Sequence, residues 1–71
     1  QKAMEADPQS QLAHYNMAIL FADAEIYREA IAEWEAAVAI DANSDIGRRS
    51  ADNIMIIREM MAAEMPEVDG R

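Results

Sequence analysis

The side chains that could carry acid–base or nucleophilic chemistry are few and far apart. His14 is the only histidine, and one helical turn later Met17 and Ala18 offer no carboxylate to orient or charge its ring. No basic side chain suited to activating a hydroxyl accompanies any of the three serines, Ser10, Ser44 and Ser50. We therefore interpret His14 as an imidazole at the edge of a core, and we expect no enzyme.

One segment has the spacing of a metal-binding loop. Asp41, Asn43 and Asp45 follow the D-x-N-x-D pattern that opens an EF-hand calcium loop. The glycine of such a loop would come directly after Asp45, where Ile46 stands, and the closing glutamate would fall at Asp52, whose side chain is shorter. We interpret the segment as a turn followed by a helix cap, and we expect neither a metal nor a cofactor.

The charge balance narrows the classes of partner. Fourteen acidic residues against six basic ones give a net charge of −8, which disfavours nucleic acid and anionic membranes as partners. No apolar run approaches the roughly 20 residues of a membrane span, and no signal-like segment opens the chain. The chain has no cysteine, so it gives no clue to the compartment. We expect a soluble chain with a protein or peptide partner, no nucleic acid and no membrane insertion.

Three helical segments must position these side chains. Fifteen alanines against two glycines and two prolines favour helix throughout. The expected helices cover about 10–23 with Ser10 as N-cap, about 27–40, and about 45–64 with Ser44 or Asp45 as cap. Because only residues 24–26 join the first two helices, these must pack antiparallel. The predicted fold class is all-α.

The first helix is apolar along two lines, although a surface helix needs only one. The first line, which we expect to pack against the second helix, is His14, Met17, Ala18 and Phe21. The second line is Leu12, Tyr15, Ile19 and Ala22. It needs a partner of its own.

The other two helices each show one main apolar face. On the second helix it is formed by Tyr27, Ala30, Ile31, Trp34, Ala37 and Val38, whereas Glu29, Glu33 and Glu35, with Glu25 before them, are expected to face solvent. On the third helix the buried line is Ile46, Ser50, Ile54, Ile57 and Met61. Met55, Ile56 and Met60 widen that apolar surface. We interpret the methionines as core filling, with an interface as the open alternative.

Residues 11–44 resemble a tetratricopeptide repeat, a helix–turn–helix unit of about 34 residues. The bulky and small positions of the family pattern correspond here to His14, Met17, Ala18, Phe21, Tyr27, Ala30, Trp34 and Ala37. Asp7 and Asp41 are one family period apart. His14 departs from the family's usual bulky residue, and Ala42 replaces the usual proline.

The resemblance implies an organisation for the whole chain. Residues 1–9 would be the end of a preceding repeat, 10–44 one repeat, 45–65 a terminal capping helix and 66–71 a flexible tail. In the third helix Arg48 stands at a bulky place of the pattern and Asp52 at a small one, which is why we interpret it as a cap.

The family uses the first helix of each repeat to line a concave groove that holds a partner. The corresponding residues here are Leu12, Tyr15, Ile19, Ala22 and Asp23. Tyr15 and Ile19 stand where some members hold a partner's terminal carboxylate, so an apolar or amphipathic segment is the expected ligand. The alternative is a structural assembly element that self-associates or packs within a larger complex. The sequence leaves both open.

Overall fold

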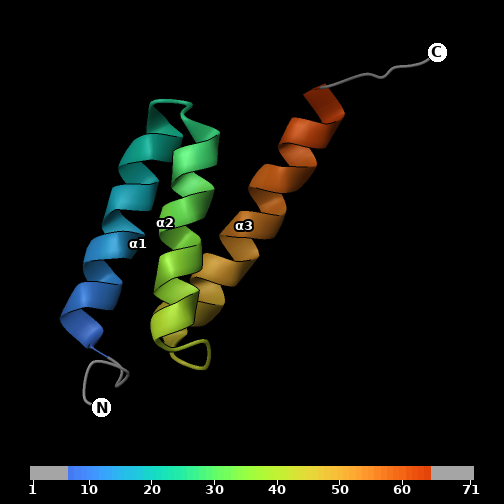
Figure 1. Ribbon diagram of the computed structural model, residues 1–71. Coiled ribbons are helices and arrows are strands. Elements are labelled where there is room, and N and C mark those ends of the chain that lie inside the picture. The colour runs from blue at the N-terminus through green and yellow to red at the C-terminus, as the bar shows by residue number, and fades with distance from the viewer. Residues whose placement is uncertain (1–6, 65–71) are drawn as a thin grey trace.

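The computed structural model describes residues 7–64 as three α-helices, α1 (Pro8–Asp23), α2 (Tyr27–Ile40) and α3 (Asp45–Glu64). α1 and α2 lie side by side and antiparallel, and α3 runs in the direction of α1 on the other side of α2 (Figure 1). α2 packs extensively against both neighbours, while α1 and α3 meet over a smaller surface. The all-α fold is confirmed. The expected helix end at 1–6 and the tail at 66–71, with residue 65, lie outside the described residues.

α1 begins earlier than the sequence suggests. Asp7 is the N-cap, and its Oδ1 accepts hydrogen bonds from the backbone N–H groups of Gln9 at 3.1 Å and Ser10 at 3.3 Å. Pro8 opens the helix, because its fixed φ suits the first turn and its missing N–H would have no helical partner there. The expectation that Ser10 caps α1 is therefore wrong.

The bounds of α2 agree with the prediction, and α3 shows which of two capping candidates is used. The backbone N–H of Gly47 donates to Ser44 Oγ at 3.0 Å, so Ser44 caps α3. Asp45 instead accepts a hydrogen bond from Arg48 at 3.0 Å within the first turn.

α1 ends in a Schellman motif. The backbone N–H of Ile26 donates to the Phe21 carbonyl at 2.8 Å, and that of Glu25 donates to the Ala22 carbonyl at 2.9 Å. Glu25 occupies the position that usually holds glycine, with a φ of 63°. It therefore lies in the turn and does not extend the acidic face of α2.

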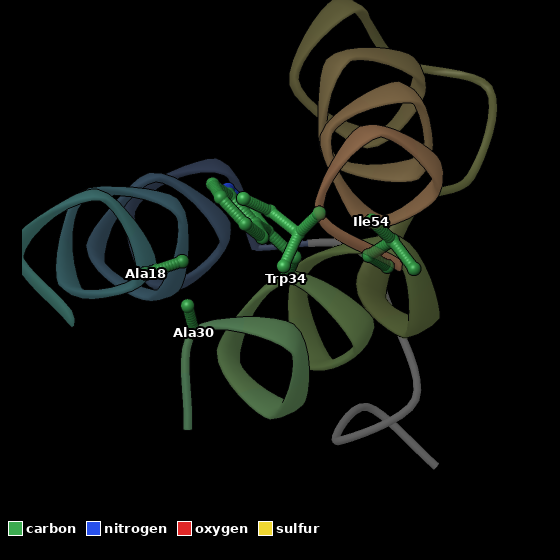
Figure 2. Packing of buried hydrophobic residues seen from close by; sticks show 5 residues of the cluster. Ala18, Ala30, Trp34 and Ile54 are labelled. Carbon is green, nitrogen blue, oxygen red and sulfur yellow. The ribbon is translucent and has the colours of Figure 1, made fainter. Parts of the chain in front are cut away.

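The core lies where the three helices meet, around one indole ring. Trp34 extends from α2 into the space between α1 and α3 and packs with Ala18, Ala30, Ile54 and Ile57 (Figure 2). Ala18 and Ala30 are fully buried, as is Ala37. Small side chains at these places let the α1 and α2 backbones approach closely. Ala18, Ala30, Trp34 and Ala37, which the sequence predicts to pack, are all buried.

The rest of the predicted packing line divides between the core and the surface. Phe21 and Tyr27 are half-buried against the core, as expected. Met17 is 45% exposed, so the prediction that it packs against α2 is wrong. Its side chain points about 100° around the helix from that of its neighbour Ala18, and so away from α2.

Buried hydrogen bonds connect one end of the α1–α2 hairpin to the start of α3. Gln11 is buried, and its Nε2 donates to the carbonyls of Ala37 at 2.8 Å and Asp41 at 2.9 Å. The Ser44 hydroxyl lies 3.0 Å from Gln11 Oε1 and 3.1 Å from the Asp41 carbonyl, and its single proton serves these two acceptors. One side chain of α1 thus satisfies carbonyl groups at the end of α2 and contacts the cap of α3.

Gly47 permits the close approach of α3 to this turn. A Cβ at this position would collide with the carbonyl oxygen of Asp41 and lie 3.0 Å from the backbone of Ala42. The chain therefore requires glycine here, although glycine weakens a helix.

Candidate interaction surface

The side of α1 that faces away from the core is apolar. Leu12 is 45% exposed, Ile19 36% and Leu20 63%. Packing against α2 uses only the opposite side, on which Gln11 and Ala18 are buried. A helix that packs on one side usually presents polar residues on the other, whereas on α1 the exposed Gln9, Asn16 and Asp23 stand among large aliphatic side chains.

The five predicted partner-binding residues differ in solvent exposure. Leu12, Ile19 and Asp23 are exposed. Tyr15 and Ala22 are half-buried and pack against the core cluster. They form the base of the predicted line, and the residues that can contact a partner directly are the other three.

α3 adds two exposed apolar side chains beside this line. Ile57 is buried in the core with Ile54. Arg58, on one side of Ile57, pairs with Glu35 of α2. Met60 and Ile56 lie on the other side of Ile57, which therefore faces away from α2. Ile56 is 55% exposed and Met60 37%. The resemblance assigned no role in binding to these residues, and the apolar spacing of α3 was the signal that could have found them.

We call the surface formed by Leu12, Ile19, Asp23, Ile56 and Met60 the α1–α3 face. By helical spacing these residues point away from α2. Figure 2 shows Trp34 between α1 and α3. Trp34 Nε1 is buried and has no hydrogen-bond partner among the described residues. No pocket is present in the described part of the chain, and the concave groove that the resemblance implies stays a prediction.

His14 lies on the opposite edge of α1. Its Nδ1 is 2.7 Å from Glu33 Oε1 on α2, and both side chains are about one-third exposed (39% and 30%). The edge-of-core interpretation of His14 thus gains a carboxylate partner that spacing along α1 could not reveal, because Glu33 lies on another helix. The expectation that Glu33 simply faces solvent is wrong.

The Asp41–Asp45 segment uses its polar groups within its own turn. Asp41 Oδ1 accepts from the backbone N–H of Asn43 at 3.0 Å, and Asp45 pairs with Arg48. No group of three or more potential metal-ligating side chains occurs within residues 7–64. The arrangement is a turn that leads into a capped helix.

None of the three described helices has the length and apolar content that a membrane span requires. Comparison of the chain with family models, with curated proteins and with solved structures finds no match.

Proposed function

We propose that this chain is a protein-interaction module of the tetratricopeptide-repeat type, with α1 and α2 as one repeat and α3 as a capping helix. The fully buried alanines at the α1–α2 contact support this. So do Arg48 and Asp52, which are exposed on α3 at a bulky and a small place of the repeat pattern. The proposed activity is binding of an apolar or amphipathic segment of a partner protein on the α1–α3 face.

The observation that carries the proposal is the exposure of large aliphatic side chains on two adjacent helices. Leu12 and Ile19 on α1 and Ile56 and Met60 on α3 each expose more than a third of their surface. Single exposed apolar residues are normal, but a contiguous apolar surface marks an interaction site. Full burial of an exposed side chain of this size contributes about 1.5–3 kcal/mol. Because these four are already about half to two-thirds buried, each contributes only part of that when a partner covers it.

Binding is favoured over catalysis by what the polar side chains already do. Ser44 is engaged with Gln11 and Gly47, and Ser50 is fully buried. The His14–Glu33 pair has the form of a base with its orienting carboxylate, but a hydroxyl within hydrogen-bond reach would be needed as nucleophile. Among the described residues the His14 ring hydrogen-bonds to Glu33, and no hydroxyl is hydrogen-bonded to it.

The alternative is a self-associating assembly element, and one observation favours it. Met55 is 61% exposed on α3, beside Ile56 and Met60, so α3 presents more apolar surface than a cap requires. Sedimentation equilibrium of the full chain tests this reading. A concentration-dependent rise in mass that Met55→Asp abolishes would favour self-association, whereas a monomer at all concentrations would oppose it.

Binding itself is tested with a peptide that has no charged side chains. The probe is a tryptophan-free synthetic peptide of about 18 residues with a leucine stripe at i, i+3, i+4 and i+7 spacing and glutamine elsewhere. Titration calorimetry gives its Kd, and the fluorescence of Trp34, the only tryptophan in the chain, reports contact at the α1–α3 face. We expect Leu12→Asp/Ile19→Asp to raise the Kd about tenfold or more.

A matched control lies on the same helix. Met17→Asp/Leu20→Asp adds the same charge to exposed α1 positions outside the α1–α3 face, and we expect it to change the Kd by less than about twofold. Far-ultraviolet circular dichroism verifies that both variants remain helical. Equal losses in both variants, or no binding by the unmodified chain, would contradict the proposed function.

A further inference from the structure

The apolar side chains of the α1–α3 face are bordered by carboxylates. Asp23 follows Ile19 by one helical turn, and on α3 Asp52 precedes Ile56 by one turn while Glu59 follows it by three residues. Residues three and four apart are neighbours on a helix surface. All three acids are exposed, and none forms an ion pair with another side chain in residues 7–63.

The positive charge near the face is smaller. Arg48 and Arg49 precede Asp52 by one helical turn. Arg48 pairs with Asp45 at 3.0 Å and Arg58 with Glu35 of α2 at 2.9 Å, so Arg49 is the basic residue that remains near the α1–α3 face among the described residues. The surroundings of the apolar side chains are therefore net negative, in keeping with the net charge of −8 for the chain. A second copy carries the same charge, so its approach to this face is opposed by repulsion.

We propose, on the basis of the proposed function, that the occupant of the α1–α3 face is a cationic amphipathic helix of another protein. Its apolar stripe covers Leu12, Ile19, Ile56 and Met60, and lysine or arginine residues beside the stripe meet Asp23, Asp52 and Glu59. The helical form follows from the α1–α3 face itself. The described chain offers no strand edge to which an extended segment could add, whereas adjacent apolar helices accept a helix.

Two further peptides test this. They share the leucine stripe of the glutamine probe and carry lysine or glutamate in place of glutamine. At about 50 mM salt we expect the lysine peptide to bind about tenfold more tightly than the glutamine peptide, and the glutamate peptide to bind more weakly than both. At about 500 mM salt the Debye length falls below the distance between surface charges, so the three affinities should converge.

Charge variants locate the effect. Asp52→Asn/Glu59→Gln removes two carboxylates beside Ile56, and we expect it to reduce the preference for the lysine peptide several-fold. Glu25→Gln/Glu29→Gln removes the same charge from the turn and from α2, which does not border the α1–α3 face, and should reduce the preference less.

The outcomes separate the two proposals. Binding of the glutamine peptide without a gain for the lysine peptide would overturn the cationic partner and leave the proposed function intact. Absence of binding by all three peptides would overturn both. Equal effects of the two charge variants would show that only net charge matters, and would contradict the placement of the cationic residues at this face.

Discussion

At the scale of single residues, Gln11 connects the three helices. Its amide donates to two carbonyls at the end of α2 and accepts from the cap of α3. We predict that Gln11→Leu lowers the free energy of unfolding by about 2 kcal/mol, because it removes two hydrogen bonds and leaves the Ala37 carbonyl with only the long bond from the Asp41 N–H at 3.4 Å. Gln9→Leu, a change at an exposed position two residues earlier in α1, should stay within about 0.5 kcal/mol. Urea unfolding of both variants, followed by circular dichroism, makes the comparison. Equal stability of the two would mean that water serves these carbonyls as well as Gln11 does.

The residue scale also shows where sequence patterns stop. Ala18, Ala30, Trp34 and Ala37 were predicted to pack, because small and bulky residues at helical spacing define a contact between helices. Gln11 was missed, since a buried glutamine has no periodic signature and its partners lie about 26 to 33 residues away in the chain.

At the scale of elements, the ends of the helices carry the most information. The α1–α2 turn places Glu25 at a φ of 63°, where a side chain costs about 1 kcal/mol relative to glycine. We predict that Glu25→Gly raises the free energy of unfolding by about 0.5–1 kcal/mol. Ala24→Gly is the control, because Ala24 has a φ of −86° and gains nothing from glycine. Thermal melts measure both variants, and Ala24→Gly should be neutral or destabilising in them. Stabilisation by both changes would indicate that loop flexibility, and not backbone strain, limits the turn.

Most helix bounds were predictable, and the exceptions have local causes. The extents of α2 and α3 followed from apolar periodicity. α1 starts at Pro8 and not at Ser10, because the Asp7–Pro8 pair supplies a cap and a preset first turn together. For the proposed site, the α1 line was foreseen from the resemblance. The α3 side chains beside it depend on how two helices are oriented in space, which periodicity within one helix does not specify.

At the scale of the whole molecule, unpaired carboxylates dominate the electrostatics. The described residues contain two arginine–carboxylate ion pairs, Arg48–Asp45 and Arg58–Glu35, and the His14–Glu33 hydrogen bond, against a net charge of −8. The two arginine pairs are well exposed, and such pairs contribute little to stability.

Salt should therefore stabilise the fold. Raising sodium chloride from about 20 to about 200 mM screens repulsion among the unpaired acids, and it weakens two surface pairs that contribute little. We predict a rise in Tm of about 3 °C, the size expected when a fraction of a kcal/mol is gained by a chain of this length. Thermal melts at constant pH measure it, with Glu25→Gln/Glu29→Gln as the comparison. Because that variant has lost two carboxylates, its Tm should depend less on salt. A Tm that falls with salt would show that attraction between charged side chains outweighs the repulsion. The His14–Glu33 and Arg58–Glu35 contacts would then stabilise the packing of the helices more than their exposure implies.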